Sequence, residues 1–366
     1  MDAADAFWDD GAALRACLGE PVPRIPPVFG YDERGSELFE AITELPTYYL
    51  TRVEWALLRA NAAEIAHRLD ADEIVELGSG SAKKTRELLA ACQRLRSTTY
   101  LPVDVSREML EHSGRSLCAA VPGLSVVGLW GRYEQALERL RTEPGGRRVV
   151  VFLGSNLGNA TPAERTELLA DIAATLAPGD GFLFSVDLLK AAEALDTAYN
   201  DPPGHRAFAD FRLNHLTHVN RRFGADFAVE QYRPRAHFVE RTGMVEGHLY
   251  ALSDQRARLP RLDLEITVPR GGSINVGFSA KFDGDRLDGE LAGHGLTVEH
   301  RWLDREWQYA ILLARRHQPR EHGDGRGQVS QGRCLGDLRH RERPSAAPVG
   351  LRHRHPAPHG PPGPAA

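Results

Sequence analysis

The chain has 366 residues, of which 42% are hydrophobic, enough to bury the core of one large domain or two ordinary ones. Its formal net charge is −5 and its pI is near 6.3, so no overall basic field favours binding to nucleic acid. The acidic first residues, MDAADAFWDDGAAL, and the lack of any apolar run of about 18 residues argue against secretion and membrane insertion.

The four cysteines are scattered along the chain, at Cys17, Cys92, Cys118 and Cys334. They form no C-x-x-C pair, and the histidines before the C-terminal tail have no recognisable metal-ligand spacing. We therefore predict a reduced, cytoplasmic protein without a metal site.

The first strongly patterned segment is RVEWALLRANAAEIAHRL, residues 52 to 69, whose apolar residues recur at helical spacing. It leads into the strand-like run DEIVEL, which breaks at Gly78-Ser79-Gly80 before a second helical segment. Glycines at such a bend let a ligand approach the backbone, and the first N–H groups of the helix can bind it. The pattern predicts a nucleotide-like cofactor site at Gly78, Ser79 and Gly80.

The spacing of this bend separates two kinds of cofactor. A dinucleotide site has the pattern G-x-G-x-x-G, but Lys83 occupies the third glycine position, which disfavours a nicotinamide-dependent dehydrogenase. Glu76 before the bend and Asp104 in the next strand-like run place carboxylates where ribose hydroxyls need acceptors. S-adenosylmethionine, which has a ribose and an amino acid tail but no phosphate, fits this arrangement. The alternative is an ordinary glycine turn with surface carboxylates.

Strand-like and helix-like runs alternate from the bend to about residue 199, which is typical of βαβ units on a mostly parallel sheet. The paired runs are TTYLPVDV with REMLEHSGRSLCAAV, LSVVGLW with YEQALERLR, RRVVVFLG with PAERTELLADIAATL, and GFLFSVDLL with KAAEALDTAY. One helix start is marked by an N-cap, a proline and a capping-box glutamate in Thr161-Pro162-Ala163-Glu164. The predicted fold class is α/β, with a Rossmann-like core and a smaller α+β lobe.

The lobe begins where the alternation ends. A long helical stretch, HRAFADFRLNHLTHVNRRF, is followed by alternating runs, and LTVEHRWLDREWQYAILLARR then predicts two strands that return to a sheet edge. Beyond Arg316 the chain is rich in Pro, Gly, His and Arg and cannot bury enough apolar surface to order itself. The predicted division is an N-terminal arm of the substrate lobe (1–50), a cofactor-binding core (51–202), an α+β substrate lobe (203–290), return strands (291–316) and a disordered tail (317–366).

Six segments carry a resemblance to a known family. They are YDERGSELFEAITELPTYYLTRVE (31 to 54), VELGSGSAKKTR (75 to 86), PVDVS (102 to 106), VVVFLGSNLGN (149 to 159), AYND around Tyr199 and FSAKF (278 to 282). Together, and in this order over about residues 28 to 316, they resemble the histidine-specific methyltransferase family. Its best-known member trimethylates the α-amino group of histidine on the way to ergothioneine.

The resemblance implies cofactor-binding roles for residues near the bend. Gly78, Lys84 and Asp104 match cofactor-binding positions, with Asp104 expected on the ribose, and Gly154 matches a backbone position beside the substrate. The alternative for Lys84 is a solvated residue of the helix surface.

The resemblance also implies a substrate pocket. Asn159 and Tyr199 match a pair that holds the carboxylate and amine end of the substrate, and Ser279 matches a reader of its side chain. Tyr31 and Tyr48 match tyrosines near the reacting nitrogen, and we assign them to catalysis. The alternatives are a helix cap for Asn159 and ordinary core packing for the three tyrosines.

Three positions depart from the family pattern. Gly277 replaces a glutamate that reads the imidazole, and Gly247 replaces a methionine of the same pocket, so a larger and less polar side chain fits the substrate pocket. Losing a hydrogen-bond partner in a buried site costs about 1 to 3 kcal/mol. Arg132, followed by Tyr133 in LWGRYE, stands where bacterial relatives place an aspartate that meets the adenine amino group. Fungal relatives methylate a prenylated tryptophan, which makes a bulky aromatic substrate a real alternative.

The resemblance therefore predicts an S-adenosylmethionine-dependent N-methyltransferase that adds up to three methyl groups to the α-amino group of an amino acid, histidine by default. The alternatives are the same chemistry on a bulkier aromatic amino acid and a non-catalytic protein that only binds cofactor. We further expect a monomer with a small-molecule substrate and no nucleic acid or membrane partner.

Overall fold

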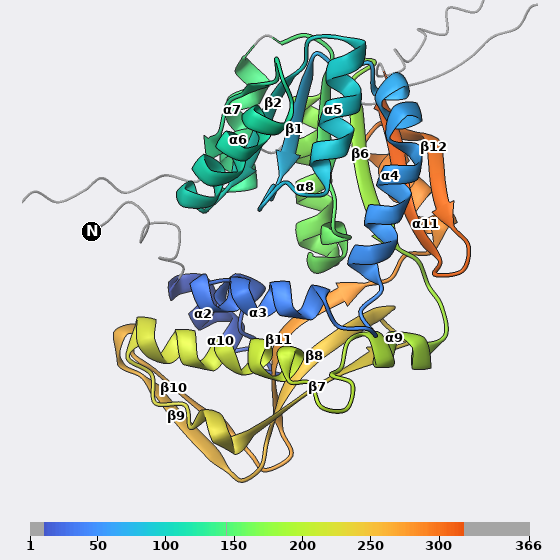
Figure 1. Ribbon diagram of the computed structural model, residues 1–366. Helices are drawn as coiled ribbons and strands as arrows, with labels where there is room; N and C mark the ends of the chain where they lie inside the picture. Colours follow the sequence, from blue (N-terminus) through green and yellow to red (C-terminus); the bar gives the residue numbers. More distant parts are fainter. Residues whose placement is uncertain (1–10, 144, 318–366) are drawn as a thin grey trace, which may run out of the picture. The chain divides into compact units, whose positions relative to one another are not determined.

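The computed structural model describes residues 11–143 and 145–317, which belong to one compact unit, Met1–Pro319. Its centre is an eight-stranded sheet in the order β12-β13-β6-β5-β1-β2-β3, with β4 also paired to β2 (Figure 1). Strands β1 to β6 pair in parallel, whereas β13 pairs antiparallel with β6 and with β12. The strands are β1 Glu73–Leu77, β2 Thr99–Asp104, β3 Ser125–Val126, β4 Leu129–Trp130, β5 Arg148–Phe152, β6 Gly181–Asp187, β12 Leu296–Asp304 and β13 Tyr309–Arg316.

Helices cover both faces of this sheet. Side chains alternate along its strands, so successive residues enter two separate apolar clusters, one on each face. Val75 and Val150 pack with α7, α8 and α11, whereas Ile74 and Val149 pack with α4, α5 and α6. These helices are α4 Leu50–Leu69, α5 Thr85–Leu95, α6 Arg107–Ala120, α7 Tyr133–Thr142, α8 Pro162–Thr175 and α11 Gly284–Gly293. Helix α9, Ala192–Ala198, lies outside this set, because its Leu195 packs with Ala236 and Val245. The predicted Rossmann-like α/β core is therefore confirmed.

One strand differs from its prediction. The run LSVVGLW forms two short strands, β3 and β4, instead of one, and the break includes Gly128, a residue with weak preference for strand. Both short strands still pair with β2.

A second set of elements forms an antiparallel layer. Strands β7 Tyr232–Val239, β8 Met244–Ala251 and β11 Ser273–Ala280 pair in the order β11-β8-β7, and β9 Gln255–Leu259 pairs with β10 Leu264–Val268. Helix α10, Ala207–Phe223, packs Leu216, Val219 and Phe223 against this layer.

The N-terminal segment joins the antiparallel layer. Leu14 of α2 (Gly11–Leu18) and Phe29 of η1 (Pro27–Gly30) pack in the same apolar cluster as α10, and Ile25 N–H donates to Asn275 O at 2.8 Å. Helix α3, Glu33–Thr43, also contacts α10. This packing supports assigning the N-terminal arm to the lobe.

The C-terminal boundary of the lobe needs adjustment. Helix α11 falls inside the predicted range 203–290, yet its Leu287 and Leu291 pack in the cluster around the central sheet. We therefore propose placing the end of the lobe near residue 283. The predicted disordered tail, apart from His317, lies outside the described residues.

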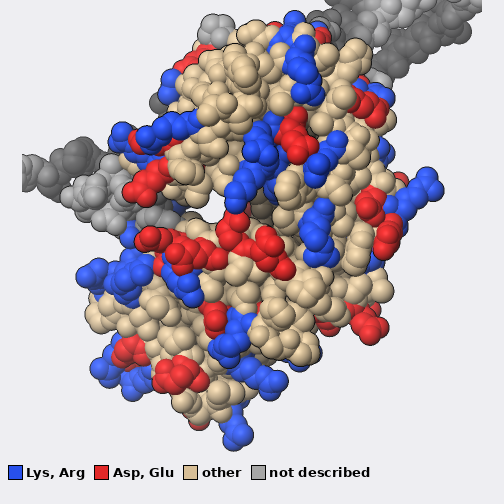
Figure 2. Space-filling view, viewed as in Figure 1, with Lys and Arg blue, Asp and Glu red and all other residues tan. Residues whose placement is uncertain are grey.

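The described surface carries both signs of charge. Figure 2 shows Lys and Arg side chains interspersed with Asp and Glu over the visible face. Among the described residues, no helix combines the length and apolar character needed to cross a membrane.

Candidate functional site

The glycine bend is held between the ends of two neighbouring parallel strands. Gly78 and Gly80 have φ angles of +68° and +50°, a region that favours glycine. Gly78 N–H donates to Val103 O at 2.9 Å, and Gly80 N–H donates to Asp104 Oδ2 at 3.0 Å. Asp104 Oδ1 accepts from Ser106 N–H at 2.9 Å, so the carboxylate is oriented at the bend with lone pairs remaining for a ligand.

The two glycines face different surroundings. A Cβ added at Gly78 would lie 2.6 Å from the Tyr133 hydroxyl, whereas one at Gly80 would meet no heavy atom within 4 Å. Tyr133 is fixed by edge-on packing against Phe152, with ring centroids 5.6 Å apart. Ser79 is buried between the glycines. The open backbone at Gly80 and the acceptors of Asp104 fit the ribose of an S-adenosyl nucleoside.

Glu76 is not available to a ribose. It is buried, its Oε1 accepts from Thr85 Oγ1 at 2.6 Å, and its Oε2 accepts from the Tyr100 hydroxyl. Burial raises the pKa of Glu76 to about 7. The structure therefore differs from the predicted role, because this carboxyl group ties β1 to β2 and to the start of α5.

Lys84 and Gly154 meet at a buried glutamate. Glu54 of α4 pairs with the Lys84 ammonium and accepts from Gly154 N–H at 2.5 Å and from the Tyr309 hydroxyl at 3.0 Å. Although burial acts to raise the pKa of Glu54, the charge and hydrogen bond of Lys84 hold it below its ordinary value. The Lys84 ammonium thus joins α5 to α4, and its role at a cofactor stays a prediction.

Asn159 ends the short helix η2, Asn156–Asn159, where it is exposed and its Nδ2 donates to Asn156 Oδ1 at 3.2 Å. It does not cap α8, since Thr161 does so through a capping box with Glu164. A Cβ added at the neighbouring Gly158 would lie 2.7 Å from the carbonyl oxygen of Ala280, so η2 contacts the end of β11 directly.

The end of β11 also holds Tyr199, the other member of the predicted pair. The Tyr199 hydroxyl donates to Ser279 Oγ at 3.0 Å, and Lys281 Nζ donates to the Tyr199 hydroxyl at 2.7 Å and to Ser279 Oγ at 3.1 Å. Lys281 is also paired with the fully buried Asp187 at 2.9 Å. Tyr199 contacts Ser279, and Gly158, the chain neighbour of Asn159, contacts Ala280. Both predicted substrate residues are therefore held near the end of β11.

The carboxylate of Asp187 is the negative charge that supports the cluster of Tyr199, Ser279 and Lys281. It accepts from the Tyr49 hydroxyl at 2.7 Å and pairs with Lys190 at 2.5 Å as well as with Lys281. Burial opposes the charge on Lys281, but the ion pair with Asp187 raises the pKa of Lys281 above its ordinary value. The ammonium is therefore charged at neutral pH.

The two predicted catalytic tyrosines occupy different positions. Tyr48 is buried and its ring packs edge-on against Tyr199 at 5.9 Å and against Phe208 at 5.7 Å. Tyr31 is 40% exposed, and its ring packs edge-on against Phe211 at 5.2 Å. The structure thus joins Tyr48 to Tyr199 and leaves Tyr31 partly open to solvent.

The two pocket glycines are directly opposite each other on β8 and β11. A Cβ at Gly277 would meet nothing within 4 Å, but its φ of +148° disfavours any other residue. A Cβ at Gly247 would lie 3.1 Å from Arg212 Nε, and Arg212 is buried over the Phe208 ring. The expected loss of volume therefore holds at Gly277, whereas Arg212 fills the space beside Gly247.

Arg132 is the N-cap of α7, and its N–H donates to Gln135 Oε1 at 3.1 Å. The next residue, Tyr133, contacts Gly78, which places this segment beside the bend. A role for Arg132 and Tyr133 at the adenine stays a prediction.

Three residues of the site were not assigned from the sequence. Glu54 lies at helical spacing from the buried Leu50 and Leu58, and a charge on the apolar face of a helix is a usable signal. Asp187 ends a parallel strand, as Asp104 does, and Lys281 stands between buried Ala280 and Phe282. Buried charges require partners, so each of these positions marks a specific contact.

Comparison with known proteins supports the resemblance found in the motifs. A model of the S-adenosylmethionine-dependent histidine-specific methyltransferases matches residues 10–316. The histidine N-alpha-methyltransferase of Mycolicibacterium smegmatis is 39% identical over 315 residues, which cover 85% of this chain and 95% of that relative. The corresponding Mycobacterium tuberculosis enzyme is 38% identical over 291 residues, covering 79% of this chain and 89% of the relative.

A more distant relative is the L-tryptophan methyltransferase of Psilocybe serbica, which is 25% identical over 335 residues, covering 83% of this chain and 92% of the relative. The family prediction made from the motifs is confirmed. The chain belongs to the S-adenosylmethionine-dependent histidine-specific methyltransferase family.

Proposed function

We propose that this protein transfers methyl groups, up to three in succession, from S-adenosylmethionine to the α-amino group of histidine as a step of ergothioneine biosynthesis. The observation that supports histidine is one hydroxyl proton left unused where Lys281, Tyr199 and Ser279 meet.

The three N–H donors of the Lys281 ammonium are all engaged, by Asp187, Tyr199 and Ser279. The Tyr199 and Ser279 hydroxyls share one hydrogen bond with each other and both accept from Lys281. Two hydroxyl protons are present and only one lies between the two oxygens, so the other proton has no acceptor within this group. Because the Tyr199 hydroxyl donates to Ser279 Oγ, Ser279 keeps the other proton and presents a donor at the side-chain end of the substrate.

A donor at this position selects for an acceptor on the substrate. Neutral imidazole offers a ring nitrogen with a lone pair, whereas indole offers only an N–H donor. A site built to satisfy one polar group rejects a ligand that leaves it unpaired. The free hydroxyl proton therefore favours histidine over tryptophan.

S-adenosylmethionine supplies an electrophilic methyl group on sulfur. The residues of this chain need only hold a neutral amine in line with it, and such alignment contributes about 7 to 11 kcal/mol. Asn159 and Tyr199 hold the carboxylate and amine end of the amino acid, Asn159 by donating from its amide and Tyr199 by accepting from the amine, and Ser279 holds the side-chain end. Asp187 and Lys281 fix Tyr199 and Ser279, so these hydroxyls need little reorganisation when substrate binds.

Repeated transfer leaves the nitrogen with fewer protons to donate and a permanent charge. Aromatic faces stabilise such a cation by about 0.5 to 2 kcal/mol. The face of Tyr199 already lies 4.5 Å from Lys281 Nζ, so we assign this role to Tyr31 and Tyr48.

The direct test is to incubate the protein with S-adenosylmethionine and with histidine or tryptophan, and to measure mass gains of one, two or three methyl units. Two histidine analogues separate the ring acceptor from the ring donor. Thiazolylalanine has a ring nitrogen acceptor without N–H, and pyrrolylalanine has a ring N–H without an acceptor. We expect histidine and thiazolylalanine to be methylated. Turnover of pyrrolylalanine but not thiazolylalanine would contradict the assignment, and cofactor binding without product from any amino acid would indicate the non-catalytic alternative.

A second candidate substrate is a bulkier aromatic amino acid. The open space beside Gly277 supports it, because no protein atom lies within 4 Å of the missing Cβ. The same panel decides, since faster methylation of tryptophan than of histidine would favour this candidate.

We also propose that the protein acts as a monomer in the cytoplasm. The described cysteines, Cys17, Cys92 and Cys118, are free thiols, as expected in a reducing compartment. A single monomeric peak in light scattering at micromolar concentration is the expected result.

A further inference from the structure

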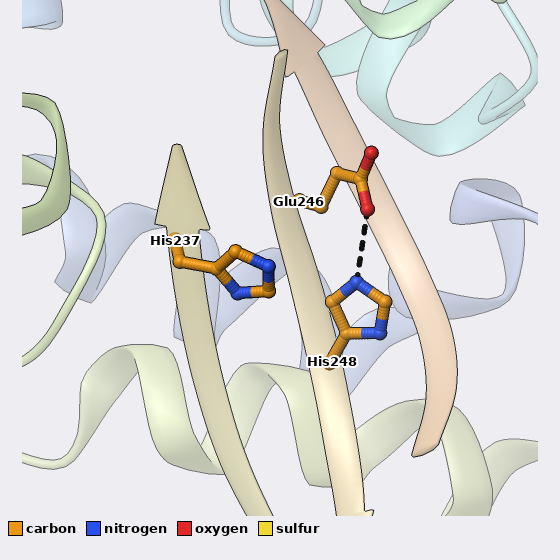
Figure 3. A group of neighbouring side chains, drawn as sticks. All are labelled: His237, Glu246 and His248. Carbon is orange, nitrogen blue, oxygen red and sulfur yellow. Dashed lines mark hydrogen bonds and ion pairs between the residues drawn. The ribbon is translucent and has the colours of Figure 1, made fainter. Parts of the chain in front are cut away.

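The antiparallel layer carries two histidines and a glutamate on neighbouring strands. His237 of β7 is directly opposite Glu246 of β8, and His248 lies two residues further along β8. Since side chains alternate along a strand, Glu246 and His248 project from the same face. Figure 3 shows the three side chains gathered on that face, with the ring of His237 directed toward the other two.

The donor atoms of the three side chains are close enough to share one ion. One ligand atom from each lies within 4.8 Å of the others, and His248 Nε2 is 3.1 Å from Glu246 Oε2. Bonds of about 2.0 to 2.2 Å in tetrahedral geometry place ligands about 3.4 Å apart. The rings of His237 and His248 are stacked, with centroids 5.3 Å apart and 21° between their planes, so binding a metal requires one ring to turn until both nitrogens face the ion.

Hydrogen bonds outside the group fix how His248 is presented. Its Nδ1 is 3.0 Å from Ser273 Oγ, which leaves Nε2 directed at Glu246. The Tyr250 hydroxyl lies 3.5 Å from His237 Nδ1, which leaves Nε2 of that ring for the ion. Metal-bound histidines typically hold their second ring nitrogen in this way, because the outer contact sets the tautomer and the ring orientation.

From these contacts, and in contrast to the prediction of no metal site made from the sequence, we propose that His237, Glu246 and His248 form a binding site for a divalent ion that prefers imidazole ligands, with Zn²⁺ as the probe. Two imidazoles and one carboxylate are a common ligand set for such ions. The ion joins β7 to β8. Gly247, a predicted substrate residue, lies between Glu246 and His248 in the chain, and Phe278, the register partner of Glu246, directly precedes Ser279. The metal site is therefore next to the predicted substrate residues. Its role is to clamp these strands together.

Two neighbouring cations oppose the ion. The buried Arg212, which lies beside Gly247, acts on His248 through its charge. Arg235 is the register partner of His248 on β7, and its side chain is exposed. It can extend into water, so it lowers the affinity without blocking the site.

The test is a zinc titration of the chelator-treated full-length protein, followed by calorimetry and by the thermal unfolding midpoint. The tail is rich in histidine, so binding is compared between variants rather than taken as a total. We expect wild type to bind one more ion than His248→Gln or Glu246→Gln, and to gain thermal stability that these variants do not gain. Ser273→Ala should weaken the same site about tenfold.

His205→Gln is the matched control, because His205 is exposed and lies outside the group. It should bind zinc as wild type does. Equal stoichiometry and equal thermal gain in wild type and Glu246→Gln would overturn the proposal, as would a thermal gain produced equally well by Mg²⁺. A variant that fails to fold is replaced by Arg235→Glu, which should bind zinc more tightly than wild type; unchanged affinity would count against the site.

Discussion

The cofactor end and the substrate end of the site depend on different kinds of interaction. At the bend, backbone N–H groups, two glycines and Asp104 form a cradle from residues 78 to 104. At the substrate end, Tyr48, Tyr199 and Lys281 come from distant segments and depend on buried charges. A backbone cradle is sensitive to local conformation, whereas a network of buried charges is sensitive to the loss of any partner.

This difference has a consequence for function. Changes at the bend should alter cofactor affinity with little effect on the substrate pocket, whereas changes at the charged network should alter stability and substrate binding together. Glu54 is the contact between the two ends, since it joins Lys84 beside the bend to Gly154, which is predicted to lie beside the substrate.

The largest effect is expected from Lys281→Met, which breaks the substrate end. It removes one cation from the buried Asp187 and frees the hydroxyls of Tyr199 and Ser279. We expect a loss of roughly 3 to 5 kcal/mol in the free energy of unfolding, measured in urea, and a higher KM for histidine.

Lys190→Met is the control for this prediction, because Lys190 also pairs with Asp187 but has no hydrogen bond to Tyr199 or Ser279. It should lower stability and leave KM close to wild type. If both variants raised KM equally, the Lys281 contacts to the two hydroxyls would have no specific role.

The second prediction concerns pH and the support beneath the bend. Burial raises the pKa of Glu76 to about 7 from its ordinary value of 4.5, so between these values the folded state binds more protons than the unfolded state. The stability contributed by Glu76 is present below about pH 4.5 and is lost as pH rises through 7. The free energy of unfolding of wild type minus that of Glu76→Gln should fall by up to roughly 3 kcal/mol across this range. A flat difference between pH 4.5 and 8 would show that the carboxyl group is not protonated in the fold.

The third prediction separates the two glycines of the bend. Gly78→Ala should cost about 1 to 2 kcal/mol for the left-handed backbone and more for the contact with Tyr133, whereas Gly80→Ala should cost only the backbone strain. In Gly80→Ala the new methyl group enters the open side of the bend, so calorimetry should show weaker binding of S-adenosylmethionine. Adding Tyr133→Phe should recover part of the stability lost in Gly78→Ala and none of that lost in Gly80→Ala.

The cofactor end was largely predictable from the sequence, because its parts are close in the chain and glycine has a clear conformational meaning. Gly78, Gly80 and Asp104 lie where the strand-turn-helix pattern placed them. Glu76 was misplaced because its position ahead of the bend is equally suited to a ribose and to a buried contact. Only the packing of Thr85 and Tyr100 decides between them.

The substrate end was less predictable, because its contacts join residues far apart in the chain. The resemblance supplied Asn159, Tyr199 and Ser279, but no local pattern pairs Lys281 with Asp187. Likewise, the volume beside Gly247 depends on Arg212 of α10, which no spacing rule connects to β8. Such pairings follow from the register of strands and the packing of helices.

The smallest effect on stability is expected from Asn159→Ala, which sharpens the comparison at the substrate end. Asn159 is exposed, and among the described residues its side chain has one hydrogen bond, to Asn156, so stability should stay within about 0.5 kcal/mol of wild type. If its amide binds the substrate carboxylate, removing one such bond costs about 1.5 to 3 kcal/mol, which is roughly 10- to 150-fold in kcat/KM. Affinity for S-adenosylmethionine should stay unchanged in calorimetry. Normal kcat/KM for histidine would remove Asn159 from the carboxylate contact and leave Tyr199 as the residue that holds that end of the substrate.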